Sequence, residues 1–419
     1  MTKTRARICL VTTGQPSTNP RLVKEADALV DAGYQVHVVG AHWAEWADEH
    51  DRALLAQKRW TVTLVDWRRA HAPLLFHKTR VRHWAARHLA GTAINALVPA
   101  AVALSRVGPE LQRTARSIPA ALYIAHNIGA LPAASAAARH HGVRCAFDAE
   151  DFHSGQLPAN DPMRRTIEAA ERILLPQCVY VTAASPGIAA AYHHLCAIPP
   201  PTTILNVFPL SERPSDFRQT DAAAPLRLYW FSQTIGPHRG LEDAVAAMGL
   251  LAPHDIELHL RGHWHDGYEQ RLRTFAHERG VSPARIVAHP PAASTDMVRC
   301  AATYDVGLAL EPSVSDNNDI AWSNKVFTYL LAGTATLMTR TTGQAALLPQ
   351  LGEAAVGCDA KNPSSLAGSL RRWLEDRQTL ERARRAAWAL GESTFNWDRE
   401  KTLFLNTVGN ALATCAHVA

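Results

Sequence analysis

Short apolar runs alternate with helical patterns along most of the chain. Ile8–Val11 predicts a buried strand, and a turn-rich loop follows it. Asn19 then predicts the N-cap of a helix with Pro20 at its first position, and Gly33 predicts the end of that helix. Val36–Val39 predicts the next strand. Continuous apolar strands on either side of a helix are typical of a parallel sheet that is buried on both faces.

The same alternation runs on to residue 205 and begins again at residue 226. In the first stretch the pattern predicts strands at Thr61–Val65, Leu122–Ala125, Arg144–Phe147 and Val179–Thr182, and helices at Leu131–His140 and Ser185–Leu195. In the second stretch it predicts strands at Leu226–Phe231, Ile256–Leu260, Val306–Leu310 and Ala335–Met338, and helices at Gly240–Leu251, Tyr268–Arg279, Lys325–Ala332, Leu366–Glu375 and Leu380–Leu390. The pattern therefore predicts two α/β domains, each with its own parallel sheet.

Three prolines mark the boundary between these domains. Pro209, Pro214 and Pro225 interrupt a polar, aperiodic run, which predicts a linker over residues 206–225. The predicted domains are then residues 1–205 and 226–392, and residues 393–419 form a C-terminal segment. Within that segment, Trp397–Thr414 predicts an amphipathic helix that crosses back to the first domain. Its apolar positions need a surface to pack against: Leu403, Leu405, Val408 and Leu412.

Composition excludes several classes of protein. Of 419 residues, 47% are hydrophobic and 19% are charged, which argues against a disordered or coiled-coil chain. The seven cysteines include no C-x-x-C pair, so they predict reduced thiols rather than a disulfide framework or a zinc site. The apolar run near the N-terminus is too short for a signal peptide, and His88–Ser105 is too short for a membrane span. We therefore expect a cytoplasmic protein.

Charge is unevenly distributed along the chain. Residues 1–210 hold 22 basic and 15 acidic residues, and residues 52–88 hold nine basic residues against one acid. Arg80, His83 and Arg87 fall on one stripe of a predicted helix, beside Val81 and Trp84. This pattern is typical of a helix that lies on an anionic membrane, and it equally fits a solvated helix face. No nucleic-acid-binding motif accompanies the charge, so we expect no nucleic acid partner.

Two loops in the second half carry candidate anion-binding chemistry. One is the turn from Gly236 to Gly240, in which Arg239 directly precedes a helix; the other is Ser323-Asn324-Lys325 at the start of another helix. The free N–H groups of a helix start, with a cation beside them, bind anions. The chain has no G-x-G-x-x-G after a strand, no P-loop and no G-x-S-x-G, which disfavours dinucleotide dehydrogenases, P-loop nucleotidases and hydrolases.

Taken in order, several segments resemble glycosyltransferase family 4, a group of the GT-B fold. They are Asn19–Ala26 with Ala32–Val36, Ala125–Asn127, Phe147–Asp151, Gly236–Leu241 and Ser323–Gly333. The resemblance implies two Rossmann-like, doubly wound parallel-sheet domains that face a central cleft. It implies an enzyme that moves a sugar, with retention, from a nucleoside diphosphate to an acceptor hydroxyl. The expected partners are a nucleotide-sugar donor and a glycan or lipid-linked acceptor, in the assembly of a bacterial surface polysaccharide at the cytoplasmic face of the inner membrane.

The resemblance also implies roles for individual residues. The implied catalytic residues are His126, Arg239 and Lys325. The implied donor-binding residues are Thr234, Gly236, Asp316, Asp319, Ser323, Asn324 and Thr328. Gly14, Arg21, Glu150 and Asp151 are expected to bind the acceptor. The chain has no D-x-D metal signature, so we expect neither a metal nor another cofactor.

The chain departs from the pattern of this family at three positions. The family usually has two glutamates at the places of Ile320 and Thr328, and often an arginine at the place of Thr234. Two other functions therefore stay open at this point: a nucleotide-sugar epimerase of the same fold, and a binding protein for sugar nucleotides without catalysis. The sequence names neither the sugar, the base, the acceptor nor the linkage.

Overall fold

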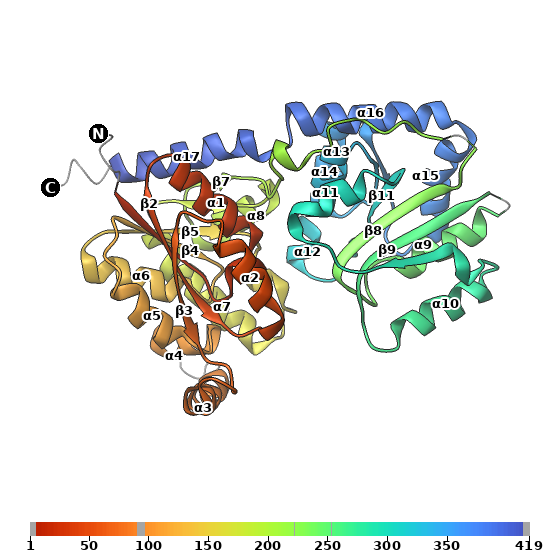
Figure 1. Cartoon of the computed structure of the whole chain (residues 1–419). Coiled ribbons are helices and arrows are strands. Elements are labelled where there is room, and N and C mark those ends of the chain that lie inside the picture. The colour runs from red at the N-terminus through yellow and green to blue at the C-terminus, as the bar shows by residue number, and fades with distance from the viewer. Residues whose placement is uncertain (1–5, 90–96, 222, 253, 414–419) are drawn as a thin grey trace. The chain divides into compact units, whose positions relative to one another are not determined.

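The computed structural model describes residues 6–89, 97–221, 223–252 and 254–413 (Figure 1). They divide into two compact units. Unit 1 contains the described residues up to Ile204 together with the last helix from Lys401 onward, and unit 2 contains Leu205–Glu400. Residue 222 of the predicted linker, part of His88–Ser105, and Thr414 of the predicted last helix lie outside the described residues.

Unit 1 is built on a seven-stranded sheet with the order β3-β2-β1-β4-β5-β6-β7. Every strand pair in it is parallel. The strands are β1 (Arg7–Val11), β2 (Gln35–His42), β3 (Thr61–Asp66), β4 (Leu122–His126), β5 (Arg144–Ala149), β6 (Val181–Ala183) and β7 (Thr202–Thr203). The helices are α1 (Pro20–Asp31), α2 (Asp48–Leu55), α3 (Pro73–Leu89), α4 (Leu97–Leu104), α5 (Gly108–Arg116), α6 (Leu131–His141), α7 (Pro162–Leu174) and α8 (Pro186–Cys196).

Unit 2 is built on a six-stranded sheet with the order β10-β9-β8-β11-β12-β13, again with parallel pairs throughout. The strands are β8 (Leu226–Ile235), β9 (Ile256–Trp264), β10 (Ile286–His289), β11 (Val306–Ala309), β12 (Ala335–Thr339) and β13 (Ala355–Cys358). The helices are α9 (Leu241–Leu250), α10 (Tyr268–Glu278), α11 (Met297–Ala301), α12 (Asp316–Ile320), α13 (Asn324–Ala332), α14 (Thr342–Leu351), α15 (Pro363–Glu375) and α16 (Arg377–Ser393). The last helix, α17 (Trp397–Ala413), begins in unit 2 and belongs to unit 1 from Lys401 onward.

Local signals in the sequence explain how these elements begin and end. The side chain of Asn19 accepts a hydrogen bond from the N–H of Leu22 and so caps α1, as predicted. Gly33 follows α1 with φ of 88°, a backbone conformation that glycine adopts without strain. All five residues of β4 are buried, which is expected for a central parallel strand that helices cover on both faces. The predicted fold of two doubly wound parallel sheets is confirmed.

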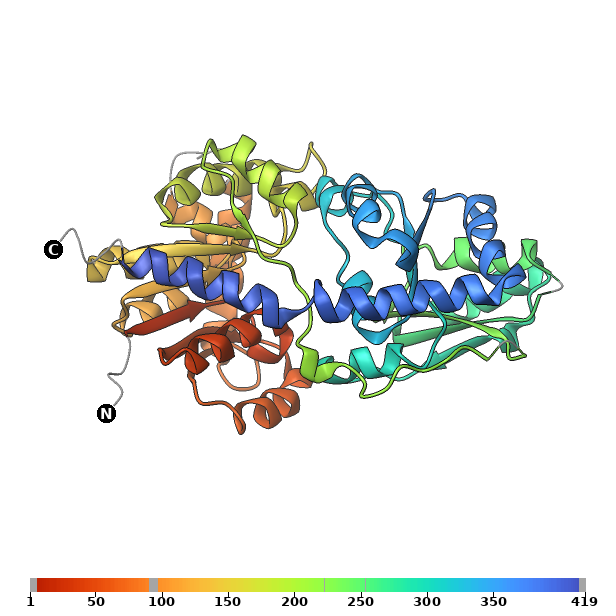
Figure 2. The same cartoon turned by 90° about the horizontal axis from the view of Figure 1, so that it is seen from above.

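Two long helices follow each other near the C-terminus. α16 runs along the outside of unit 2 and packs against α13 and β12 (Figure 2). In α17, Phe404, Val408 and Ala411 are buried, whereas Leu403 is 42% exposed. Val408 is thus buried as predicted, Leu405 and Leu412 are half-buried, and Leu403 does not belong to the buried stripe. The first turn of α17 is tied to the preceding connection, because the N–H of Trp397 donates to the carbonyl of Phe208.

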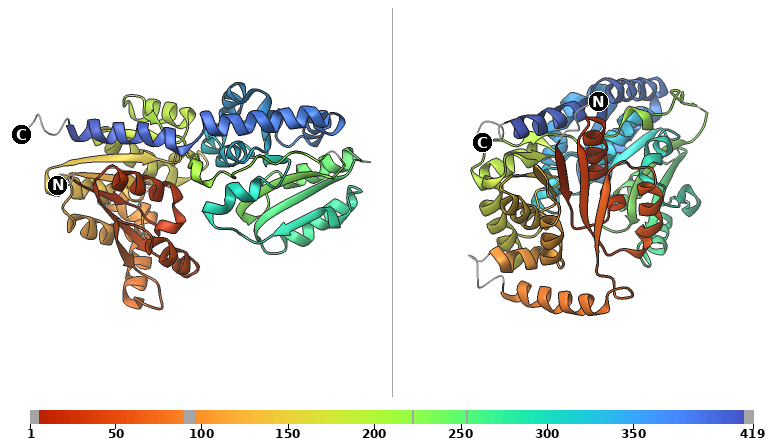
Figure 3. Two further views of the ribbon diagram at one scale, coloured as in Figure 1. Left: turned by 45° about the horizontal axis from the view of Figure 1, so that its top comes forward. Right: turned by 60° about the vertical axis from the view of Figure 1, so that its left-hand side comes forward.

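Helix α3 lies at the outside of unit 1, beyond the edge of the helices that cover its sheet (Figure 3). The sequence placed Arg80, His83 and Arg87 on one stripe of this helix. In the structure Nδ1 of His83 lies 2.7 Å from the carbonyl oxygen of Val102, so His83 turns toward the protein. The predicted stripe is wrong in this respect: Arg80 and Arg87 are exposed, and His83 is not part of their face. Among the described residues, no helix is long and apolar enough to cross a membrane.

A buried carboxyl group in α7 makes the stability of unit 1 depend on pH. Glu171 is fully buried, and its Oε1 accepts hydrogen bonds from Oη of Tyr192 at 3.0 Å and from the N–H of Ser154 at 3.2 Å. Burial raises the pKa of Glu171 to about 7. Because its pKa is raised in the folded state, Glu171 contributes stability when it is protonated. This contribution is lost as the pH rises from the ordinary range of a glutamate through about 7.

We therefore expect Glu171→Gln to raise the free energy of unfolding, relative to the unmodified protein, more at about pH 8 than at about pH 5. The amide keeps an acceptor for Tyr192 and Ser154 and removes the cost of a buried charge. Urea unfolding at the two pH values measures the difference. Glu168→Gln, on the same helix at 28% exposure, is the matched control for loss of a carboxylate alone. An equal effect of Glu171→Gln at both pH values would contradict the prediction.

Candidate functional site

The first candidate region is the turn between β8 and α9, at the carboxyl end of the sheet in unit 2. β8 and β11 are neighbours in this sheet, although they are not consecutive in the chain, so the strand order reverses between them. Gly240 is the N-cap of α9, with φ of 74°. A Cβ on Gly240 would lie 2.6 Å from Cβ of Leu310, so only glycine lets this turn pack against the end of β11. Ligands of open α/β sheets bind at such a reversal.

A charged pair lies directly beyond the end of β11. Nζ of Lys325 is 2.5 Å from Oε1 of Glu311, and Oγ of Ser323 donates to the same oxygen at 2.9 Å. The other carboxylate oxygen, Oε2, is buried without a hydrogen-bond partner. Burial raises the pKa of Glu311, but the ammonium of Lys325 and the hydroxyl of Ser323 outweigh it, so the net pKa lies below the usual range. Glu311 therefore holds Lys325 in place and balances its charge.

Two helices begin at this edge without a capping side chain. Ser323 occupies the N-cap position of α13, but its hydroxyl donates to Glu311 and does not cap the helix. Gly240, the N-cap of α9, has no side chain to offer. In α13 the N–H of Val326 donates to the carbonyl of Ser323, and the N–H groups nearest each helix start are left for another acceptor. Arg239 is exposed beside the start of α9, and among the described residues no carboxylate pairs with it. The edge combines two helix starts with one unpaired cation, which suits an anion.

The other predicted donor-binding residues differ in how accessible they are. Thr234 and Asn324 are exposed, whereas Gly236 is buried beside His265. Thr328 is fully buried, and its hydroxyl donates to the carbonyl of Asn324 one turn earlier in α13. Its predicted contact with a donor stays a prediction, and the burial of the side chain speaks against it.

The two predicted aspartates lie within the short helix α12. Asp316 is exposed in its first turn. Asp319 accepts hydrogen bonds from Oγ of Ser313 at 2.7 Å and from the N–H of Thr342 at 3.3 Å. Asp319 therefore connects the loop after β11 to the start of α14. Its observed contacts are structural, and a contact with a donor sugar stays a prediction for both aspartates.

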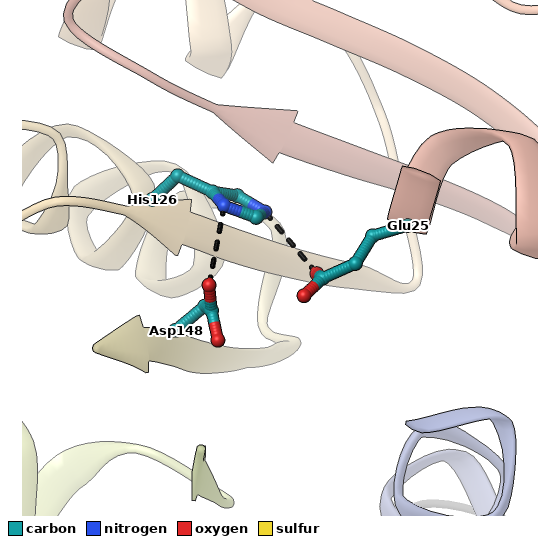
Figure 4. A group of neighbouring side chains, drawn as sticks. All are labelled: Glu25, His126 and Asp148. Atoms are coloured by element: carbon teal, nitrogen blue, oxygen red, sulfur yellow. Dashed lines mark ion pairs between the residues drawn. The ribbon is translucent and has the colours of Figure 1, made fainter. Parts of the chain in front are cut away.

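The second candidate region is a buried charge cluster in unit 1 (Figure 4). It lies where α1, β4 and β5 meet. Nε2 of His126 is 3.3 Å from Oε2 of Glu25, and its Nδ1 is 3.5 Å from Oδ2 of Asp148. Arg21 donates from Nε to Oδ2 of Asp148 at 2.6 Å and from Nη2 to Oδ1 at 2.7 Å. All four side chains are at most 1% exposed. They form a compact network inside the unit.

The pKa values in this network follow from burial and from the neighbouring charges. Burial lowers the pKa of His126, but Glu25 and Asp148 outweigh it and the net pKa is raised. Burial and the charge of Asp148 raise the pKa of Glu25. Burial also opposes the charged form of Asp148, yet the guanidinium of Arg21 holds the pKa of this carboxyl below its usual range. The network therefore keeps Asp148 ionised and favours a proton on His126.

Burial bears on two predicted roles in this region. Arg21 was expected to bind an acceptor and His126 to act on a sugar, but neither side chain reaches the surface in this structure. Arg21 contacts Asp148 and donates to the carbonyl of Ile204 at 2.8 Å, so its observed contacts hold the unit together, and a contact with an acceptor stays a prediction. A catalytic contact of His126 stays a prediction, and it would require the ring to become uncovered.

The other predicted acceptor residues lie nearer the surface. A Cβ on Gly14 would lie 2.9 Å from Oγ1 of Thr18 and 3.8 Å from Nε1 of Trp43, so the side chain of Thr18 packs closely against the backbone at Gly14. Asp151 accepts from Nε2 of Gln156 at 2.9 Å. Glu150 is half-buried, with one oxygen that has no hydrogen-bond partner. Burial and the charge of Asp148 raise the pKa of Glu150 to about 7.

Metal binding can be judged from the same network. Glu25, His126 and Asp148 each offer one ligand atom, and these atoms lie within 4.8 Å of one another. The guanidinium of Arg21 already supplies the positive charge that this set needs, because it contacts both oxygens of Asp148. The arrangement does not require an ion, and the expectation that no metal takes part stays a prediction.

Sequence reasoning missed three carboxylates that organise these regions: Glu25, Asp148 and Glu311. Asp148 and Glu311 both follow apolar strand residues, and an acid at the carboxyl end of a buried parallel strand is a signal that could have found them. Glu25 lies four residues after Arg21 in α1, so the two face each other on the helix, and Nε of Arg21 is 3.5 Å from Oε1 of Glu25. That spacing was visible in the sequence.

Solved structures with similar folds span nearly the whole chain. Alr3699/HepE of Anabaena, solved in complex with UDP, is 15% identical with a TM-score of 0.69, covering 97% of this chain and 100% of that one. Sucrose-phosphate synthase of Thermosynechococcus elongatus is 14% identical with a TM-score of 0.68, covering 98% and 100%. TarM is 10% identical with a TM-score of 0.65, covering 98% and 99%. No family model matches this sequence, and no curated protein matches it. These likenesses do not single out family 4, but they show that the chain has the GT-B fold.

Proposed function

We propose that this protein is a glycosyltransferase that moves a sugar from a nucleoside diphosphate donor to an acceptor hydroxyl. The observation that carries the proposal is the edge of unit 2 where α9 and α13 begin. Both helix starts lack a capping side chain, and Arg239 and Lys325 stand beside them. A diphosphate has the charge and the acceptor oxygens that such an edge can bind. The fold is shared with HepE, which binds UDP and UDP-glucose in its solved structures.

The proposed chemistry follows from where charge develops. When the bond between the sugar and the diphosphate breaks, negative charge grows on the leaving diphosphate. Arg239, Lys325 and the N–H groups at the start of α13 would stabilise this charge without moving, because Glu311 already fixes Lys325. We propose that the transfer retains the configuration of the sugar, which nuclear magnetic resonance of the first-formed product would test.

The central experiment measures nucleotide binding by calorimetry with UDP and with the diphosphates of the other bases. Arg239→Ala is expected to weaken binding of the preferred diphosphate by about 1.5–3 kcal/mol, the usual contribution of a hydrogen bond to a charged group. Arg371→Ala is a matched control, because Arg371 is also an exposed arginine of the same unit and lies in α15. Unchanged affinity in Arg239→Ala, or an equal loss in the control, would show that the anion binds elsewhere.

A product assay separates the proposed activity from the two alternatives. A glycosyltransferase forms a glycosylated acceptor and releases the diphosphate. An epimerase of the same fold would convert one nucleotide sugar into another without an acceptor, and a binding protein would form no product.

We further propose that the acceptor is a lipid-linked glycan of a bacterial surface polysaccharide, used at the cytoplasmic face of the inner membrane. The exposed basic residues Lys78, Arg80 and Arg87 support this choice, and extraction of radiolabelled product into organic solvent tests it.

A further inference from the structure

The outward face of α3 carries three exposed apolar side chains, with the exposed histidines His77 and His88 on the same stripe. Leu74 is 88% exposed, Val81 is 66% exposed and Trp84 is 62% exposed. Among the side chains that the structure describes, no other large apolar residue is as exposed as these three. They are spaced by seven and three residues, so they lie on one stripe of the helix. Such a stripe gains free energy when another apolar phase covers it.

The opposite face of α3 is held to the protein by polar contacts. Nη2 of Arg82 lies 2.5 Å from Oε2 of Glu110 and donates to the carbonyl of Arg106 at 3.0 Å. The guanidinium of Arg106 lies 4.3 Å from the ring centre of Phe76 and 4.3 Å from that of Trp67. These contacts fix the rotation of the helix about its axis. The exposed stripe is therefore a defined surface of unit 1, with charged groups on its inner side and apolar groups outside.

Basic residues border the apolar stripe on both sides. Arg80 and Arg87 lie along one side and Lys78 along the other, and all three are exposed. α3 contains no acidic residue, and among the described residues no carboxylate pairs with these three cations. A helix with exposed apolar side chains, a tryptophan and a basic border matches the boundary between lipid headgroups and acyl chains. Its charge complements anionic lipids in particular.

We propose that unit 1 docks on an anionic phospholipid bilayer through the outward face of α3. Leu74, Val81 and Trp84 enter the headgroup region, and Lys78, Arg80 and Arg87 contact lipid phosphates. Trp43 and Trp46 of the same unit are also exposed, at 47% and 60%, but they lie outside α3 and are not part of this surface. The inference goes beyond the proposed glycosyltransferase activity and does not depend on it.

Vesicle binding of the full chain tests the proposal. Vesicles of phosphatidylglycerol with phosphatidylcholine are compared with vesicles of phosphatidylcholine alone, at low and at high sodium chloride. The unmodified protein is expected to bind the anionic vesicles, and binding should fall with salt because salt screens the phosphates. Combined Lys78→Gln, Arg80→Gln and Arg87→Gln should weaken partitioning roughly a hundredfold, about fivefold for each charge. Combined Val81→Ser and Trp84→Ser should weaken it on the order of tenfold or more.

A matched control removes three charges elsewhere in unit 1. Arg116, Arg139 and Arg144 are exposed arginines of α5, α6 and β5, and their replacement by glutamine should leave partitioning nearly unchanged. Far-ultraviolet circular dichroism and the urea unfolding curve should be the same in every variant, which shows that each one is folded. Equal losses in the control and in the α3 variants would overturn the proposal, because binding would then follow net charge. Absence of vesicle binding together with a dimer that Val81→Ser and Trp84→Ser dissociates would assign the face to a second copy of the chain.

Discussion

Replacement of Arg21 by methionine is expected to lower the free energy of unfolding of unit 1 by about 3–5 kcal/mol, the cost of breaking a buried ion pair. Arg21 contacts both oxygens of Asp148 and donates to the carbonyl of Ile204. Without the guanidinium, the carboxylate of Asp148 is left as a buried charge with only His126 to balance it. Urea unfolding measures the loss, and hydrogen exchange in β4 and β5 assigns it to unit 1.

The control for this prediction is a second arginine pair of the same unit. Arg59 pairs with Asp31 on the surface, where the two side chains are 70% and 58% exposed. Arg59→Met should therefore cost about 1 kcal/mol or less. The double change Arg21→Met with Asp148→Asn should recover part of the loss, because it also removes the unpaired carboxylate. If the free energy of unfolding of Arg21→Met lies within about 1 kcal/mol of that of the unmodified protein, the network does not hold unit 1 together as described.

The elements that the sequence predicted share strong local signals. β1, β4 and β12 are central strands made largely of buried apolar residues, and the ends of α1 are defined by Asn19 and Gly33. Three edge strands were missed: β7 with two residues, and β10 and β13 with four residues each. Apolar runs of that length are also common in loops. The place of these strands in the sheets comes from pairing with β6, β9 and β12, which a local pattern does not contain.

The candidate site was only partly predictable for a similar reason. Arg239 and Lys325 were found because each stands at a helix start, which is a local feature of the sequence. The pairing of Lys325 with Glu311 spans fourteen residues and depends on the fold of the loop between them. The burial of His126 depends on α1 and β5 packing around it, so composition and spacing alone could not show that the ring is covered.

The pair of Glu311 and Lys325 leads to the second large effect, because the two residues should act on anion binding with opposite signs. Lys325→Met removes a cation from the start of α13 and leaves the carboxylate of Glu311 unbalanced near the expected diphosphate. A lost charged hydrogen bond costs about 1.5–3 kcal/mol, and repulsion from Glu311 adds to it. We therefore expect UDP affinity to fall by about 3 kcal/mol or more, roughly 150-fold, which calorimetry would measure.

Glu311→Gln separates this arrangement from a direct contact between Glu311 and the donor. The amide keeps an acceptor for Ser323 and removes the negative charge, so Lys325 is free to pair with the diphosphate. UDP should then bind at least as tightly as it does to the unmodified protein, and Glu311→Gln should restore part of the affinity lost in Lys325→Met. Weaker binding in Glu311→Gln alone would mean that the carboxylate itself touches the nucleotide. The buried Oε2, which has no hydrogen-bond partner, would then be the atom that makes that contact.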